Sequence, residues 1–188
     1  RMGWFIIVGS LPIVLLGVTL KDIIENDLRN LWIIGTTLIV LGLVLGLADK
    51  IGRNEKAIKA LTLRDAILMG FAQAAALVPG VSRSGATISM GRFLGYEREA
   101  ATRYAFLLAI PAVVGAGLFQ LPEIPDGDNL YGWGPTLAAT VVSFIIGYAA
   151  IAWLLRYVST NSYTPFVVYR VLLGGTVLVL LGTGVLTA

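Results

Sequence analysis

An arginine between two serines is the part of this sequence best suited to chemistry. Arg83 is flanked by Ser82 and Ser84, and Gly80 and Gly85 stand nearby on either side. A guanidinium carries several N–H donors in one plane, hydroxyls donate and accept, and glycines leave backbone N–H groups open to a ligand. Phosphate is bound by groups of this kind. The spacing therefore predicts an anion-binding loop.

The position of Arg83 strengthens this hypothesis. The uncharged stretch 66–82 leads directly to it, and a charge inside a membrane-embedded segment is expensive and marks a functional site by default. A structural turn between two packed helices would account for the glycines, but it leaves the arginine unexplained. We therefore favour anion binding over a plain turn.

The surrounding chain has the composition of an integral membrane protein. Of its 188 residues, 57% are hydrophobic and 13% charged, and the mean hydropathy is +0.84, whereas soluble domains carry about 25% charged residues. The sequence predicts an all-α polytopic integral membrane protein with one membrane domain, residues 1–188. Uncharged stretches long enough to span a bilayer are 3–20, 31–48, 104–122, 129–155 and 171–188.

The sequence has no cysteine and no histidine. Disulfides, Cys/His zinc sites and a histidine general base are therefore excluded within it. The net charge of +3 is too small to suggest a nucleic-acid partner. The first residue is Arg1 and no cleavable signal peptide is evident, so we expect a part of a longer protein.

Basic residues orient the predicted spans, because loops rich in Lys and Arg stay in the cytoplasm. Loop 48–64 is basic and is placed inside, loop 120–134 is acidic and is placed outside, and loop 21–30 is mixed. The spans then alternate in direction. Segment 63–103 must consequently begin and end on the cytoplasmic side.

Pro79 and Gly80 divide that segment into two arms too short to cross the bilayer. The pattern predicts a re-entrant helix pair, about 63–95, with 81–84 at its tip. Irregular backbone at membrane depth must line protein or a water-filled cavity, and the second arm directs its positive N-terminal end into the same cavity. Broken helices of this kind are typical of inverted-repeat membrane folds.

The run 77–88, Leu-Val-Pro-Gly-Val-Ser-Arg-Ser-Gly-Ala-Thr-Ile, resembles the second signature of the bacterial undecaprenyl-diphosphatase family, also called the bacitracin-resistance protein family. Gln73 and the runs 106–111 and 165–170 agree with the same family. The resemblance implies two inverted repeats, each with a re-entrant helix pair. It also implies hydrolysis of undecaprenyl diphosphate to undecaprenyl phosphate in the bacterial plasma membrane. That reaction recycles the lipid carrier of peptidoglycan synthesis, with the active site on the extracytoplasmic side.

The resemblance assigns roles to individual residues. Arg83 would hold the diphosphate, and Ser82, Ser84 and Thr87 would complete the catalytic group. A hydroxyl nucleophile needs an activating base or metal and none is visible nearby, so we favour ligand-orienting roles for these hydroxyls. For Gln73, contact with phosphate or a metal-bound water and an interhelical hydrogen bond are equal alternatives. Further predicted contacts to the diphosphate are Gly80, Val81, Gly85, Ala86 and Gln73.

One part of the family pattern has no counterpart here. The family's first signature is rich in glutamate and followed by a Ser-Ser-Thr-Gly-His type loop, and neither it nor the first transmembrane helix is found. We expect the chain to be the C-terminal two-thirds of a longer protein and to hold half of a phosphatase site. A divalent cation, Mg²⁺ or Ca²⁺, is expected, with ligands that cannot be identified in this sequence.

A transporter or flippase of a phosphorylated polyprenyl lipid is the competing hypothesis, because broken helices and midplane anion sites also occur in transporters. In both hypotheses the partners are a polyprenyl diphosphate lipid and the bilayer, and a homo-oligomer is compatible with each.

The remaining charged and aromatic residues have structural interpretations. Arg170 is predicted to snorkel to the cytoplasmic interface, with a buried ion pair as the alternative. An interfacial charge cluster without a catalytic role is predicted for Arg92, Arg98, Arg103, Glu97 and Glu99. An aromatic belt is predicted for Trp4, Trp32, Trp133, Tyr131 and Tyr163. A solvated acidic loop is preferred over a cation site for Glu123, Asp126 and Asp128.

Overall fold

The computed structural model describes residues 1–20, 23–24, 28, 30–120 and 132–187. Within these ranges the chain is helical, with one isolated backbone bridge between Lys56 and Tyr96. The helices long and apolar enough to cross a membrane are α1 (Met2–Thr19), α3 (Leu31–Ile51), α6 (Arg98–Gln120), α7 (Trp133–Val158) and α8 (Thr164–Gly182). The predicted class, an all-α polytopic membrane protein, is confirmed. Four residues with predicted roles lie outside the described ranges: Tyr131, Glu123, Asp126 and Asp128.

The last helix begins before the uncharged stretch 171–188, at the run 165–170 that the sequence places at its start. Helix α8 begins at Thr164, with Pro165 in its first turn, where proline needs no N–H partner. Arg170 lies inside α8 and is buried, so its guanidinium can contact groups inside the protein.

Two shorter helices form the predicted hairpin. Helix α4 (Leu63–Ala74) continues into the 3₁₀ turn η2 (Ala75–Leu77), and α5 (Arg83–Phe93) follows after a loop. Helices of 12 and 11 residues are about 18 and 16 Å long, well short of the roughly 30 Å hydrocarbon core. The hairpin and its break at Pro79 are as predicted, and its re-entrant placement in a bilayer stays a prediction.

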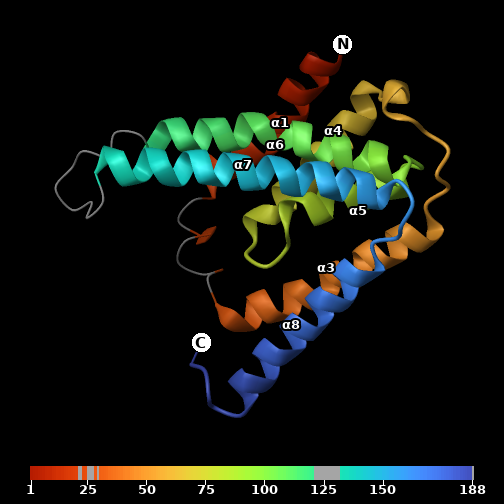
Figure 1. Cartoon of the computed structure of the whole chain (residues 1–188). Helices are drawn as coiled ribbons and strands as arrows, with labels where there is room; N and C mark the ends of the chain where they lie inside the picture. Colours follow the sequence, from red (N-terminus) through yellow and green to blue (C-terminus); the bar gives the residue numbers. More distant parts are fainter. Residues whose placement is uncertain (21–22, 25–27, 29, 121–131, 188) are drawn as a thin grey trace.

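Helices α3 and α8 form an antiparallel pair that diverges from α6 and α7 in Figure 1. Glycines allow the close approach: a side chain at Gly35 would meet Leu178, and one at Gly42 would meet Arg170. Small residues at helix contacts are a common feature of membrane bundles. The loop between α4 and α5 lies between this pair and the layer that contains α6 (Figure 1).

The end of α3 and the starts of α6 and α8 meet at one end of the molecule. Asp49 at the end of α3 accepts hydrogen bonds from Arg98 at the start of α6 and from the backbone N–H of Tyr163, just before α8. Near the start of α1, the backbone carbonyl of Phe5 accepts a hydrogen bond from Tyr104 of α6. These contacts agree with the predicted alternation of span directions.

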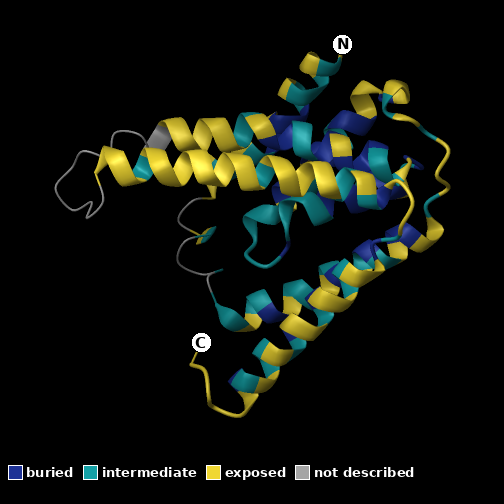
Figure 2. Ribbon diagram, viewed as in Figure 1, coloured by how far each residue is buried: buried dark blue, intermediate teal, exposed yellow. Residues whose placement is uncertain are grey.

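Large apolar side chains cover much of the surface. Figure 2 shows α7 and the outer side of α8 almost entirely exposed, and no residue in the most apolar stretch of α7 is buried. Exposed apolar faces of this extent suit contact with lipid tails rather than with water. The buried core lies where α1, α4, α5 and α6 meet.

Candidate anion-binding site

The loop before α5 has a backbone conformation that few residues adopt. Gly80 has φ +88° and Ser82 has φ +69°, a region that glycine enters freely and serine enters at a cost. The Ser82 hydroxyl accepts a hydrogen bond from the backbone N–H of Gly85 at 3.2 Å and so caps α5. The turn therefore starts α5 abruptly and leaves its first N–H groups directed outward.

Side chains of α3 and α8 hold this loop in place. The hydroxyl of Thr37 lies 2.8 Å from the carbonyl oxygen of Pro79. Arg170 donates from Nη2 to the carbonyl oxygens of Gly80 at 2.9 Å and Val81 at 3.0 Å. The expectation that Arg170 snorkels to the interface is wrong, because its guanidinium is turned inward to satisfy loop carbonyls.

A cavity of about 220 Å³ adjoins the start of α5. Its polar wall is formed by Ser82, Ser84 and Arg170. The guanidinium of Arg170 lies close to the first turn of α5, because a Cβ added at Gly85 would be in van der Waals contact with Nη1 at 3.5 Å. No carboxylate is among the described residues that line this cavity. Its charge is therefore positive, as an anion site requires.

Arg83 leaves α5 on the side of α6. It is half-buried, and its one hydrogen bond among the described residues is a long one, 3.5 Å from Nη1 to the carbonyl oxygen of Ala109. Most of its donors are thus uncommitted to the part of the protein that the structure describes. Arg83 and Arg170 place positive charge on two sides of the same helix start.

The other predicted site residues occupy different surroundings. Val81, Ala86 and Thr87 are buried, and the Thr87 hydroxyl donates to the carbonyl oxygen of Arg83 within α5 at 2.9 Å. A hydroxyl committed in this way stabilises α5. The structure therefore brings Ser82, Ser84, Gly85 and Arg170 together at the cavity. Arg83 turns away from it toward α6, and Thr87 is buried within α5.

Gln73 of α4 is fully buried, and neither atom of its amide has a hydrogen-bond partner among the described residues. The interhelical hydrogen bond considered as one alternative is not formed there. A buried amide without a partner is unfavourable by about 1–3 kcal/mol and calls for an explanation. Contact with substrate stays a prediction for this residue.

The predicted interfacial charge cluster is largely a buried ionic network. Arg92 is 1% exposed and pairs with Asp49, which also receives Arg98 Nε at 2.6 Å. Arg92 also donates to the carbonyl oxygens of Tyr96 and Gly52. Arg103, paired with Glu99 one helical turn away, and Glu97 have the exposed positions expected of the cluster. The buried part of the network joins helix ends, which suits a structural role.

Tyr163 belongs to the same network, and its assignment to an aromatic belt is wrong. It is 2% exposed, and its hydroxyl lies within hydrogen-bond distance of Thr102 and of the Arg98 carbonyl. Burial raises the pKa of Tyr163 to about 12, so the hydroxyl stays protonated at neutral pH. Trp4, Trp32 and Trp133 are exposed, as a belt requires.

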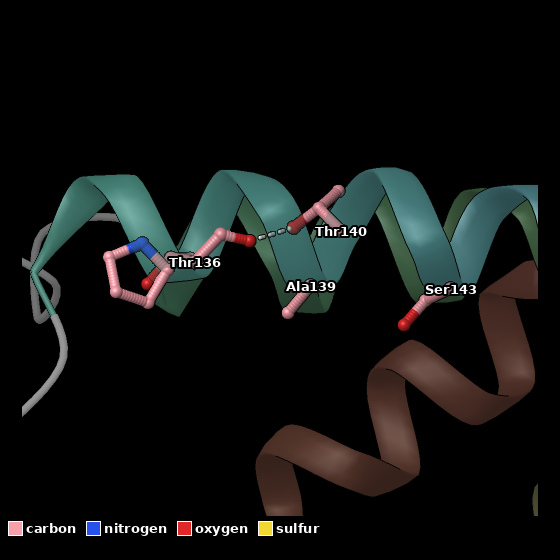
Figure 3. Close-up of a pocket in the computed structure, with 5 residues that line it drawn as sticks. Thr136, Ala139, Thr140 and Ser143 are labelled. Atoms are coloured by element: carbon pink, nitrogen blue, oxygen red, sulfur yellow. Dashed lines mark hydrogen bonds between the residues drawn. The ribbon is translucent and has the colours of Figure 1, made fainter.

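A second pocket lies on one side of α7 near its start (Figure 3). Its wall consists of small residues, and Thr140 uses its hydroxyl to bond the carbonyl oxygen of Thr136. No charged side chain is among the described residues that line it. It lacks the groups that an anion requires.

The carboxylates that the structure describes do not form a site for the expected divalent cation. Within the described ranges no three Asp or Glu side chains come together to hold a metal ion. Asp49, which is buried near α5, is already committed to two arginines. The residues around the loop therefore do not form a cation site by themselves.

Comparison with known proteins adds independent findings. The family described as bacitracin resistance protein BacA matches residues 1–176. An undecaprenyl-diphosphatase of a Nocardioides species is 75% identical over 188 residues, which cover all of this chain and 69% of that protein. Undecaprenyl-diphosphatase 2 of Agrobacterium fabrum is 60% identical over 188 residues, with 100% and 68% covered. The undecaprenyl-diphosphatase of Micrococcus luteus is 57% identical over 191 residues, with 100% and 69% covered.

Proposed function

The chain belongs to the family of bacitracin resistance protein BacA, and on this premise we propose that it forms the phosphate-binding part of an undecaprenyl-diphosphatase. The reaction is hydrolysis of undecaprenyl diphosphate to undecaprenyl phosphate and inorganic phosphate. One observation carries the assignment of the site: Arg170 and two serines line a cavity at the N-terminus of α5 that has no carboxylate among its described lining residues, and Arg83, the first residue of α5, directs its guanidinium toward α6.

The site binds negative charge through groups that are already in position. The first N–H groups of α5 have no partner within the helix and carry the positive end of its dipole. Arg83 contributes donors from the α6 side and Arg170 contributes charge from the α8 side. Groups held in advance stabilise the charge that spreads over phosphate oxygens during phosphoryl transfer.

The hydroxyls orient the diphosphate in this proposal. Ser84 faces the cavity and can donate to a phosphate oxygen, whereas Ser82 is engaged in capping α5. Thr87 supports the helix behind them. A serine nucleophile would need a base, and no carboxylate lines the cavity among the described residues.

The attacking group and any cation ligands are proposed to come from outside the residues that surround this loop. The relatives support this division, since the chain covers 69% of the Nocardioides protein. A divalent cation, Mg²⁺ or Ca²⁺, would neutralise phosphate charge when bound. The residues described around the loop do not fit it alone, so no step is derived through it.

The proposed setting is the bacterial plasma membrane, with the site open to the extracytoplasmic side. The basic residues of loop 48–64 support a cytoplasmic position for that end of the molecule. The hairpin α4–α5 would then enter from the cytoplasm and present its loop part-way through the bilayer. The exposed apolar face of α7 is compatible with lipid or with a second copy of the chain.

Substitution of Arg83 tests the function. In the complete protein, with whatever residues flank positions 1–188, Arg83→Ala should lower phosphate release from undecaprenyl diphosphate at least 100-fold, because removing one positioned donor of this kind costs about 2.7–4 kcal/mol. Arg103→Ala, an exposed control, should retain turnover. Wild-type turnover by Arg83→Ala would refute the assignment. Movement of the lipid across reconstituted vesicles without phosphate release would favour a transporter instead.

A further inference from the structure

The cavity beside Ser84 has both polar and apolar lining residues. The polar ones include Ser82, Ser84 and Arg170, and the apolar ones are Ile88 of α5, Leu154 of α7 and Phe166 of α8. An inorganic anion would need only the polar residues. A cavity that offers both kinds suits an amphiphile, which has a charged part and an apolar part.

The cavity is continued by a groove on the outer surface. Tyr169 lines both the cavity and a groove of about 790 Å³ between the end of α7 and the start of α8. Along α8 the groove is lined by Val168 and Leu172, which are 50% and 65% exposed, and at the turn between the two helices it is lined by Asn161, Ser162 and Thr164. A ligand too long for the 220 Å³ cavity could therefore extend past Tyr169 toward the bilayer.

One aromatic contact joins α7 to α8 beside the cavity. The ring of Tyr157 on α7 meets that of Phe166 on α8 edge to face at 6.0 Å, and Trp153 stacks on Tyr157 within α7 at 5.5 Å. Aromatic pairs of this kind stabilise the packing of the two helices.

We propose that the cavity and the groove form the subsite for the isoprenoid tail of the lipid, which leaves the membrane domain between α7 and α8. The inference rests on the proposed function and extends it by locating the tail. The first isoprenoid units lie against Ile88, Leu154 and Phe166, next to the diphosphate. The following units pass Tyr169 and lie along the groove, in contact with lipid. Tail burial contributes binding in the ground state and transition state alike, so it acts on KM more than on kcat.

Two variants and two matched controls test this placement. In the complete protein, Leu154→Trp fills the cavity, and Tyr169→Ala removes the exposed ring at its mouth. Leu137→Trp and Tyr148→Ala make the same changes on exposed positions of α7 that line neither space. Equilibrium binding of radiolabelled undecaprenyl diphosphate and of inorganic pyrophosphate is measured in detergent, together with phosphate release.

We expect Leu154→Trp to weaken binding of the lipid at least tenfold, about 1.4 kcal/mol, and Tyr169→Ala to weaken it about threefold. Pyrophosphate binding should change less than twofold, and the controls should match the wild type. Unchanged lipid binding in both variants would overturn the proposal, as would an equal loss for pyrophosphate. A wild-type protein that binds the lipid but releases no phosphate would refute the proposed function, while the tail subsite would still be judged by the lipid affinities.

Discussion

Replacement of Arg170 by lysine keeps the positive charge near the loop but removes the planar group that donates two hydrogen bonds to it. Arg170 is 9% exposed, and its Nη2 donates to the carbonyl oxygens of Gly80 and Val81 at 2.9 and 3.0 Å. Lysine keeps the charge, but its single ammonium on a flexible chain does not reproduce the planar guanidinium. We expect it to satisfy one carbonyl and to leave the other without its charged donor.

The magnitude follows from the lost contact. A hydrogen bond from a charged group contributes about 1.5–3 kcal/mol, which corresponds to about 10-fold to 150-fold in an equilibrium or rate constant. If the loop must be held for the anion to bind, Arg170→Lys should lower kcat/KM for phosphate release from undecaprenyl diphosphate by that factor. Arg103→Lys, at a site that is 51% exposed, should have kcat/KM within twofold of the wild type.

The assay pairs kcat/KM with thermal unfolding in detergent, both on the complete protein. A residue with a purely structural role would lower the unfolding temperature and leave kcat/KM of the folded fraction unchanged. Wild-type kcat/KM in Arg170→Lys would therefore refute the reasoning that this arginine positions the loop for phosphate.

Three further substitutions probe the loop, the network and the buried amide. Gly80→Ala should lower the free energy of unfolding by at least about 2 kcal/mol, since the φ of Gly80 is +88° and the added methyl group would meet α3. Gly115→Ala, which has open space around it, should leave the free energy of unfolding unchanged. Equal stabilities of the two variants would contradict this account. Asp49→Asn should lower the free energy of unfolding by about 3–5 kcal/mol, because it leaves buried arginine charge uncompensated. The control Glu99→Gln should lower it by less than about 1 kcal/mol. A smaller loss of stability for Asp49→Asn than for the control would be inconsistent with the network. Gln73→Leu should leave the free energy of unfolding equal or higher, since neither polar atom of the side-chain amide has a described partner. If the amide contacts substrate, the same variant should have a lower kcat/KM for phosphate release. Full activity would show that Gln73 is not part of the site.

Local features of the sequence predicted much of this arrangement. The long apolar stretches correspond to the spanning helices, and Pro79 with Gly80 marks the break in the hairpin, because both signals depend on the residues themselves and their immediate neighbours. The start of α5 beside Ser82 was also expected. These elements determine the position of Arg83.

Arg170 was missed as a partner of the loop because its contacts join distant parts of the chain. The argument applied to Arg83, a single charge in an apolar segment, applies equally to Arg170, which is followed by uncharged residues to position 188. Snorkelling was the simpler explanation because Arg170 is close to the start of α8, where a long side chain can reach the interface. The network of Asp49, Arg92 and Tyr163 could not be predicted for the same reason: its members pair across three connections that no local pattern links.

The tether from Arg170 to the loop also sets an order of assembly. Arg170 and Gly80 are 90 residues apart in the chain, so the complete signature is synthesised long before the side chain that holds it. Until α8 has been inserted, the carbonyl oxygens of the loop lack this donor. A polypeptide that ends before Thr164 would thus carry every residue of the signature and still bind undecaprenyl diphosphate poorly, which equilibrium binding to such a truncated protein would reveal. Competence of this site is a property acquired only after α8 has been synthesised and inserted.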